Sequence, residues 1–353
     1  MSWRAAIEAW LGTDLYIDLG TANTLVVDRD EGLIVNEPSV IAYKVMADGR
    51  RRIVAVGAEA KLRLGKTPGH LTARRPLRAG VVSDLDATEA MLRHFIWLAR
   101  RAKKGWRALG RPRVLMSLPY GVSDVEKKAV RECGLLAGAR EVLLMDEPMA
   151  AAIGAKLPVR QARGSMVIDI GGGTTEAAVM ALCGIVACEA VRVGGDAFDE
   201  AIVEFMRRRY NLLIGEPSAE RLKLQIGTAD LGAQEAQPEA QAEVRGLDAT
   251  SGLPRSLEVN AAEIHEALQP KLELILQAAR RVLERTPPEL LADLLAEGVV
   301  LAGGGALLCG LPERMSRELA LPVRRAPDPL LAIAAGGAEG LRDPELLERV
   351  SFV

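Results

Sequence analysis

Short apolar runs separated by turn residues dominate the first part of the chain after residue 13. Their length, their alternation and the flanking Gly, Pro, Asn and Asp residues predict β-strands at 15–19, 24–28, 34–35, 40–43 and 53–56. Residues 1–12 have a different pattern, because their large apolar residues recur at helical spacing. The chain therefore begins with an amphipathic segment and continues with a group of strands.

Helical periodicity then alternates with short apolar strands. Helices are predicted near 84–104, near 123–137 and from Pro148, with strands at 114–118 and 142–145. The second half repeats this order with a hairpin at 166–180, a strand at 185–193, a helix at 196–208, helices at 261–284 and 288–296, and a strand at 299–301. The polar stretch 228–245 is expected to be a surface excursion. A group of strands followed by alternating helices and strands thus occurs twice. This order predicts two related α/β domains with a ligand cleft between them.

Composition narrows the class of protein. A chain of 353 residues with 49% hydrophobic and 26% charged residues is long enough for about two well-packed domains. A net charge of −2 and an aromatic content of 3% argue against nucleic acid as a partner. The four cysteines include no C-x-x-C pair, which fits a reducing compartment. No apolar run approaches the roughly 20 residues of a membrane span, and the start lacks signal-peptide features, so a cytoplasmic protein is expected.

Two segments repeat the same chemistry in the two halves. Asp18–Thr24 (DLGTANT) and Asp169–Glu176 (DIGGGTTE) each join two apolar strands, so each is typical of a tight hairpin turn headed by a carboxylate. Glycines admit an anion close to backbone N–H groups, and Asp beside polyphosphate normally faces a metal ion. A single such Asp could merely cap its turn. Because the motif occurs twice, we expect Asp18 and Asp169 to converge on a hydrated Mg²⁺ and the loops to hold one nucleotide.

A third candidate segment follows the predicted strand at 299–301. Gly303, Gly304 and Gly305 precede Ala306, and a backbone without side chains could lie flat against a base and a ribose. The same glycines could serve packing alone. Their position after two candidate phosphate loops favours the nucleoside interpretation.

Glu147 is the fourth candidate, where a predicted strand ends at Asp146 and a helix begins with Pro148. A carboxylate there could favour the helix N-terminus, or it could orient a water that attacks a γ-phosphate. The chain contains neither a Walker A motif nor a strand-Gly-x-Gly-x-x-Gly-helix unit. P-loop and Rossmann folds are therefore disfavoured.

Two segments are candidates for contact with a membrane. The N-terminal stripe could be a docking helix or could lie in the bilayer interface, as its two tryptophans suggest; it consists of Trp3, Ile7, Trp10 and Leu11. Between Arg100 and Arg113 the chain holds seven basic and no acidic residues around Trp106 and Leu109. This second segment could be a solvated basic loop, a nucleic-acid patch or a site for anionic lipid.

Several stretches resemble the MreB family of the actin/Hsp70/sugar-kinase superfamily, from residue 18 to about residue 330. They are DLGTANTLV, NEPSV, SDVEKKAV, AGAREVLLMDEPMAAAIGAKLPV, VIDIGGGTTEAAV, VGGDAFDEAI, AERLKLQIGTA, LERTPPELLADL and LAGGGALLCGLPE. The sequence departs from the family at Asp146, where a glutamate is common, in QIGTAD, and in AIAAGGAEGL, which lacks an arginine. These departures affect peripheral nucleotide contacts or filament contacts rather than the phosphate loops.

The resemblance implies an α/β, actin-like, duplicated RNase H-like fold with ATP (ADP after hydrolysis) and Mg²⁺ in an interdomain cleft. It assigns the first phosphate loop to Gly20, Thr21, Ala22 and Asn23, and the second to Gly171, Gly172, Gly173, Thr174 and Thr175. Asp18 and Asp169 would serve the metal, Glu147 would be the hydrolytic residue and Thr174 would help to place the water. The ribose and base would contact Glu220, Lys223, Gly303, Gly304, Gly305 and Ala306. Without the resemblance, Glu220 and Lys223 would be a solvated i, i+3 pair.

The resemblance also implies four subdomains after the amphipathic segment 1–11. Subdomain IA would comprise 12–31, 76–155 and 326–353; IB 32–75; IIA 156–195 and 257–325; and IIB 196–256. The expected function is that of a membrane-associated filament with slow ATPase activity, which organises cell-wall synthesis and rod shape at the inner face of the cell membrane. Its partners would be further copies in paired protofilaments, anionic lipid and membrane proteins of the wall machinery. Positioning of plasmids or organelles and a small-molecule kinase are the alternatives.

Overall fold

The structure is a computed structural model that describes residues 13–46, 49–63, 71–78, 81–103 and 110–352. The chain divides into two compact units, each described below by itself. Unit 1 comprises Met1–Gln161, Leu182–Gly184 and Leu331–Val353, and unit 2 comprises Ala162–Ala181 and Ile185–Leu330.

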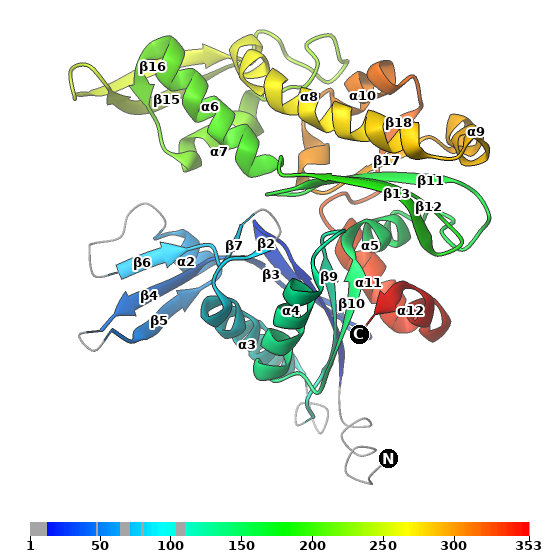
Figure 1. Ribbon diagram of the computed structural model, residues 1–353. Helices are drawn as coiled ribbons and strands as arrows, with labels where there is room; N and C mark the ends of the chain where they lie inside the picture. The colour runs from blue at the N-terminus through cyan, green and yellow to red at the C-terminus, as the bar shows by residue number, and fades with distance from the viewer. Residues whose placement is uncertain (1–12, 47–48, 64–70, 79–80, 104–109, 353) are drawn as a thin grey trace. The chain divides into compact units, whose positions relative to one another are not determined.

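Unit 1 is built on a six-stranded sheet with the order β19-β10-β9-β1-β2-β3 (Figure 1). Its strands are β1 (Asp14–Leu19), β2 (Asn23–Asp28), β3 (Gly32–Pro38), β9 (Arg113–Leu118), β10 (Glu141–Asp146) and β19 (Ser351–Phe352). The strands β1, β2 and β3 form an antiparallel meander, whereas β9 and β10 run parallel to β1. Strands that are covered on both faces need apolar residues throughout, and β1, β2 and β9 are almost wholly buried.

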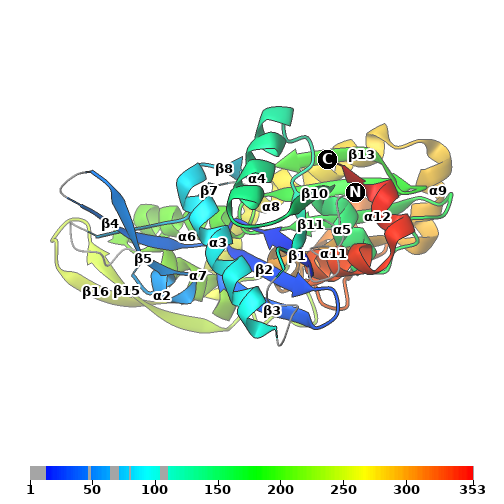
Figure 2. The same cartoon turned by 90° about the horizontal axis from the view of Figure 1, so that it is seen from below.

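Helices cover both faces of this sheet. Leu15, Ile17 and Leu19 of β1 share a core with helices α3 (Leu85–Ala102) and α4 (Asp124–Leu136), which lie side by side in Figure 2. The intervening residue Tyr16 faces α11 (Ala332–Arg342), where Gly337 leaves room for its ring. Helix α5 (Glu147–Gly154) packs against α11, and α12 (Pro344–Val350) follows.

Smaller elements complete unit 1. A three-stranded sheet has the order β5-β4-β6 and is accompanied by a short helix. These elements are β4 (Ile41–Val45), β5 (Arg51–Val56), α2 (Ala58–Lys61) and β6 (Leu71–Arg74), and a separate pair is formed by β7 (Leu77–Arg78) and β8 (Val81–Val82).

Unit 2 repeats the topology of unit 1. Its sheet has the order β13-β12-β11-β17-β18, again an antiparallel meander followed by strands parallel to the first. The strands are β11 (Ser165–Ile170), β12 (Thr175–Ala181), β13 (Gly184–Val191), β17 (Val299–Ala302) and β18 (Val323–Arg325). The duplication predicted from the repeated order of strands and helices is therefore confirmed.

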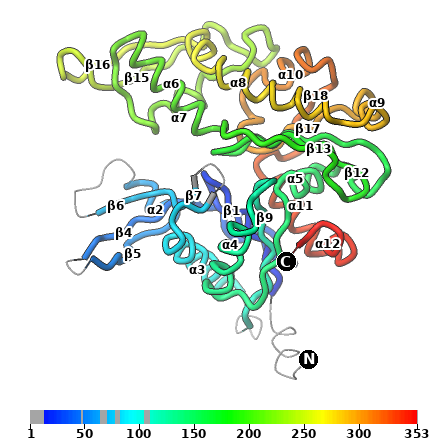
Figure 3. Tube along the Cα trace, viewed as in Figure 1, coloured from blue at the N-terminus to red at the C-terminus, as the bar shows by residue number. Residues whose placement is uncertain are grey.

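The helices of unit 2 pack in one core with this sheet. Helix α8 contacts α6, α10 and β12, and Figure 3 shows α8 and α10 side by side along the chain trace. The helices are α6 (Gly195–Tyr210), α7 (Glu216–Ile226), α8 (Ala261–Arg285), α9 (Pro288–Glu297), α10 (Leu311–Leu319) and the 3-10 turn η2 (Gly304–Leu307).

Most of the polar stretch 228–245 lies at the surface, as expected, but its end is part of a sheet. Its last residues form β15 (Gln241–Asp248), which pairs with β16 (Pro254–Asn260) beside β14 (Leu212–Leu213). Val244 is the one fully buried residue of β15. Because most side chains of this strand are exposed or partly exposed, its composition resembles that of a loop, and the sequence pattern does not predict the strand.

Candidate functional site

The first candidate loop lies where predicted, between β1 and β2 in unit 1. Leu19 pairs with Thr24 across the hairpin, so Gly20, Thr21 and Ala22 form a tight turn. A Cβ atom on Gly20 would lie 2.6 Å from the carbonyl oxygen of Asn23. Glycine is therefore required for the conformation of the turn itself, whatever the loop binds.

Ser39 supports this loop from the end of β3, and sequence reasoning did not assign it a role. Its hydroxyl donates to the carbonyl oxygen of Gly20 at 2.6 Å, and its N–H donates to the carbonyl oxygen of Ala22 at 2.9 Å. The Thr24 hydroxyl lies 2.8 Å from that of Ser39, and both side chains are fully buried. The only sequence signal was the stretch NEPSV within the family resemblance.

Asp18 and Glu147 lie at the same edge of the unit 1 sheet. Asp18 is opposite Ser117 on the parallel strand β9, and β10 ends at Asp146 beside the end of β9. Because β1, β9 and β10 are parallel, their carboxyl ends share this edge, the usual place for ligands in open α/β sheets. Asp18 and Glu147 are each 8% exposed.

Asp146 is the last residue of β10 and lies near Lys127 of α4. Burial raises the pKa of Asp146, and the positive charge of Lys127 on α4 opposes that rise. Asp146 occupies the N-cap position of α5 but makes no side-chain capping hydrogen bond. Glu147 is the first residue of α5, so the direction of this helix decides where its carboxylate lies.

The position of α5 is fixed by an unusually close contact with α11. A Cβ atom on Gly154 would lie 1.8 Å from the carbonyl oxygen of Ala332, and one on Gly336 would lie 1.8 Å from that of Ala150. Backbone therefore meets backbone at this crossing. The segment AIAAGGAEGL, noted for its missing arginine, is the half of the contact contributed by α11.

The second candidate loop lies between β11 and β12 in unit 2. Ile170 pairs with Thr175, and the N–H of Gly171 donates to the carbonyl oxygen of Thr174 at 2.9 Å. Two loop carbonyls accept hydrogen bonds from the start of α6: Gly195 N–H to Gly171 at 3.0 Å and Asp196 N–H to Gly172 at 2.8 Å. Carbonyl oxygens repel anions, so engaging them at α6 suits a loop that receives a phosphate.

The surroundings of the Asp169 carboxylate show whether this residue could face a bound cation. Its carboxylate is 3% exposed, and within the described part of the chain its Oδ1 atom has no hydrogen-bond partner. Burial raises the pKa of Asp169 to about 7. An unpaired buried carboxylate oxygen is costly unless a cation or donor reaches it, so this residue fits a role toward Mg²⁺.

Gly303 brings the third candidate segment against Asp169. It has a φ of 77°, and a Cβ atom there would lie 2.3 Å from the carbonyl oxygen of Ile170 and 2.8 Å from Asp169 Oδ1. The turn Gly303–Ala306 therefore lies at the carboxyl end of β17, next to the second loop. The described residues include no cluster of three or more His, Cys, Asp or Glu side chains placed to hold a metal ion.

Glu220 and Lys223 both lie on α7 in unit 2, and Lys223 is not a solvated partner of Glu220. Its ammonium lies 2.8 Å from Asp199 Oδ1 and donates to the carbonyl oxygen of Gly195 at 2.9 Å. The Lys223 side chain is 15% exposed. The structure thus connects α7 to the same helix start that holds the second loop.

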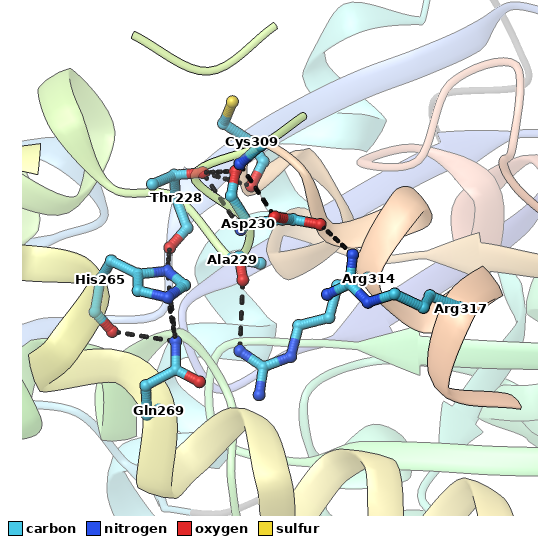
Figure 4. A network of polar contacts seen from close by, with 9 residues as sticks. Thr228, Ala229, Asp230, His265, Gln269, Cys309, Arg314 and Arg317 are labelled. Atoms are coloured by element: carbon cyan, nitrogen blue, oxygen red, sulfur yellow. Dashed lines mark hydrogen bonds and ion pairs between the residues drawn. The ribbon is translucent and has the colours of Figure 1, made fainter. Parts of the chain in front are cut away.

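The segment after α7 is fastened to the segment after η2 (Figure 4). Ala229 N–H donates to the carbonyl oxygen of Cys309 at 2.7 Å, and His265 Nδ1 lies 3.0 Å from the carbonyl oxygen of Thr228. Arg317 pairs with Asp230 at 2.5 Å, and this hydrogen bond lowers the pKa of that carboxyl.

Arg314, which is 8% exposed, donates to the carbonyl oxygen of Ala229 at 3.2 Å. The segments that follow the two nucleoside candidates, α7 and the turn Gly303–Ala306, are therefore held in one network within unit 2.

The candidate residues thus form two groups. Asp18, Gly20–Asn23 and Glu147 lie in unit 1; Asp169, Gly171–Thr175, Glu220, Lys223 and Gly303–Ala306 lie in unit 2. The membrane candidates Trp3, Ile7, Trp10, Leu11, Trp106 and Leu109 lie outside the described residues. Among the described helices, none combines the length and the apolar character that crossing a membrane requires.

The duplicated sheets, each with a glycine-containing turn after its first strand, define the actin-like class. Among solved structures, MreB 5 of Spiroplasma citri bound to AMPPNP matches with a TM-score of 0.87 and 30% identity, covering 96% of this chain and 98% of that chain. The MamK double helical filament matches in fold with a TM-score of 0.76 and 23% identity, covering 94% and 99%. The expected actin-like fold is confirmed.

The family follows from the sequence itself. The family model of the MreB/Mbl protein matches residues 12–349, and the chain belongs to this family. Cell shape-determining protein MreB of Escherichia coli (strain K12) is 49% identical over 329 residues, which are 93% of each chain. Cell shape-determining protein Mbl of Bacillus subtilis (strain 168) is 44% identical, over 92% of this chain and 94% of its own.

Proposed function

We propose that this protein is an ATP-dependent, filament-forming cytoskeletal protein that organises cell-wall synthesis and rod shape at the inner face of the cell membrane. The observation that carries the proposal is the 49% identity to a cell shape-determining protein over 93% of the chain. Two loops suited to phosphate, at equivalent sheet edges in both units, support it. Neither a kinase substrate pocket nor a specific organelle cargo has comparable support.

ATP is the proposed ligand of both loops. A relative at 30% identity has been solved with AMPPNP and with ADP, which supports nucleotide binding by this chain. Gly20–Asn23 and Gly171–Thr175 would bind the phosphates, and Glu220, Lys223 and Gly303–Ala306 would bind the ribose and base. Bound Mg²⁺ would be held through water by Asp18 and Asp169 and would neutralise charge on the phosphates.

Slow hydrolysis coupled to assembly is the proposed activity. Glu147 would orient the attacking water, with Thr174 helping to place it, because positioning is the main contribution that a protein makes to phosphoryl transfer. The rigid contact between α5 and α11 supports this role, since it holds the helix that begins with Glu147. Assembly would complete the alignment of Glu147 with the attacking water. ATP hydrolysis would therefore act as a timer for the filament.

Membrane attachment and partners complete the proposal. Trp3, Ile7, Trp10 and Leu11, together with Trp106 and Leu109 in a basic segment, would insert into anionic lipid. The proposed partners are further copies of the chain in paired protofilaments and membrane proteins of the wall machinery. The division into subdomains IA, IB, IIA and IIB remains part of this proposal.

Sedimentation and electron microscopy with MgATP, with and without anionic liposomes, test the proposal. We expect ordered polymers that form with ATP and coat the liposomes, and loss of rod shape when the protein is depleted from its cells. Transfer of phosphate to a sugar without polymers would favour the kinase alternative instead. Normal rod shape after depletion, with mislocalised plasmids or organelles, would favour the positioning alternative.

A further inference from the structure

Lys223 is held in place by residues of unit 2 itself. An ammonium group has three N–H donors, and one of those of Lys223 is directed to the carbonyl oxygen of Gly195 at 2.9 Å. The Asp199 carboxylate, which lies one turn farther along α6, makes an ion pair with the same ammonium at 2.8 Å. Asp199 is 7% exposed. A flexible side chain is thereby fixed by two partners on one helix.

The same turn of α6 holds the second candidate loop. Gly195 and Asp196 donate to the carbonyl oxygens of Gly171 and Gly172, at 3.0 and 2.8 Å. Gly194 makes this approach possible, because a Cβ atom there would lie 2.5 Å from the Gly171 carbonyl oxygen. One residue, Gly195, therefore links Lys223 through its C=O to the loop through its N–H, and its C=O shares a peptide unit with the Asp196 N–H that holds Gly172.

We propose that Asp199 is a positioning residue for nucleotide binding, which holds Lys223 toward the nucleoside and, through Gly195, holds the loop Gly171–Gly173 toward the phosphates. Asp199 itself touches neither part of the ligand. The inference rests on the proposed function and deepens it, because it couples recognition of the two ends of one nucleotide within unit 2.

The electrostatics of Asp199 make the coupling measurable. Burial raises the pKa of Asp199 to about 6, against the lowering effect of Lys223. Glu220 on α7 and Asp196 on α6 add to the rise. Protonation below about pH 6 would remove the ion pair and release the ammonium.

Asp199→Asn in the full chain tests the inference through binding of fluorescent ATP and ADP analogues. At pH 7.5 we expect the variant to bind both about tenfold more weakly. The ratio of variant Kd to wild-type Kd should fall toward one at pH 5, because the wild-type carboxyl is then protonated. The ratio cancels titration of the phosphates of the analogues themselves.

Two further measurements separate positioning from general damage. In a Lys223→Met background Asp199→Asn should cause no additional loss. Without nucleotide, the amides of Gly171–Gly173 should exchange hydrogen faster in Asp199→Asn than in wild type. Glu204→Gln is the matched control, because Glu204 lies on the same helix but pairs with Arg208 at 2.6 Å.

Equal affinities at pH 7.5, or a loss that persists in the Lys223→Met background, would overturn the inference. Binding of neither analogue by the wild-type chain would instead refute the proposed function. In that case amide exchange at Gly171–Gly173 still decides whether Asp199 holds the loop.

Discussion

The Asp169 carboxyl is buried, and no described residue donates a hydrogen bond to its Oδ1 atom. Its pKa of about 7 lies well above the value of about 3.9 expected in an unfolded chain, and burial is the cause. A raised carboxyl pKa adds stability that is fully present below the unfolded value and is lost as the pH rises through the folded value. Ionised Asp169 therefore costs stability at neutral pH, which is explicable if a cation normally occupies its surroundings.

Asp169→Asn should raise the free energy of unfolding of the nucleotide-free protein by on the order of 2 kcal/mol at pH 8. The gain should shrink as the pH falls from 7 toward 4, because native Asp169 then becomes neutral by itself. Urea unfolding at pH 8, 6 and 4.5 measures this dependence, with the exposed Asp328→Asn as control. An equal gain at all three pH values would contradict the assignment of the cost to this charge.

Glu147→Ala should abolish phosphate release while ATP binding and polymer formation persist. The physical reason is that water orientation is lost while both loops remain intact. Phosphate assays and sedimentation on the same samples measure the two properties. The control is Glu141→Ala, at the exposed start of the strand that leads to Glu147. Wild-type turnover in Glu147→Ala would refute the catalytic assignment.

At the scale of elements, the contact between α5 and α11 determines where Glu147 lies. The contact depends on glycines because the approaching atoms belong to the backbone. Not every glycine of α11 serves this purpose: a Cβ atom on Gly340 would meet Leu115 at an ordinary distance of 3.7 Å. The helix thus contains Gly336, where a side chain would overlap the backbone of α5, and Gly340, where a methyl group fits.

Gly336→Ala should destabilise the protein by about 3 kcal/mol or more, because the new methyl group would overlap the Ala150 carbonyl. Gly340→Ala on the same helix should be neutral or stabilise by up to about 1 kcal/mol through helix propensity. Thermal and urea unfolding of both variants measure the difference. Similar stability of the two variants would show that α11 can move away from α5.

The elements that carry the candidate site were predictable from sequence, whereas their supports were not. Asp18 and Asp169 each lie beside glycines between two apolar runs. That local pattern predicts a hairpin turn headed by a carboxylate. Ser39 supports a turn nineteen positions earlier, and Asp199 holds a lysine on another helix. Such contacts depend on how elements pack, which no local pattern contains. For the same reason, the sequence of AIAAGGAEGL does not predict that α11 contacts α5 through its glycines.

At the scale of the whole molecule, the chain repeats one topology in two units and adds candidate membrane segments to it. A helix of about twelve residues is marginal alone, so a single copy should bind lipid weakly. Many copies in one polymer would bind together, and the effective affinity would rise steeply. Membrane attachment and assembly should therefore depend on each other.

Deletion of residues 1–11 combined with Trp106→Ala should abolish co-sedimentation with anionic liposomes while ATP-dependent polymers still form. This variant removes all but one of the residues proposed to insert into lipid, and the described cores of both units are untouched. Trp97→Ala is the matched control, because this tryptophan on α3 is 50% exposed and belongs to neither segment. Liposome binding retained by the combined variant would exclude residues 1–11 and Trp106 as the anchor.

The glycine contact between α5 and α11 has a genetic consequence. A clash with a neighbouring side chain can be relieved by a smaller residue at the neighbour, but the atoms facing Gly154 and Gly336 are main-chain carbonyl oxygens, which every amino acid carries. No second substitution opposite these positions can restore the fit. Suppressor screens that start from a substitution at Gly336 should therefore yield true revertants or changes elsewhere in the protein, and never an exchange at Ala150.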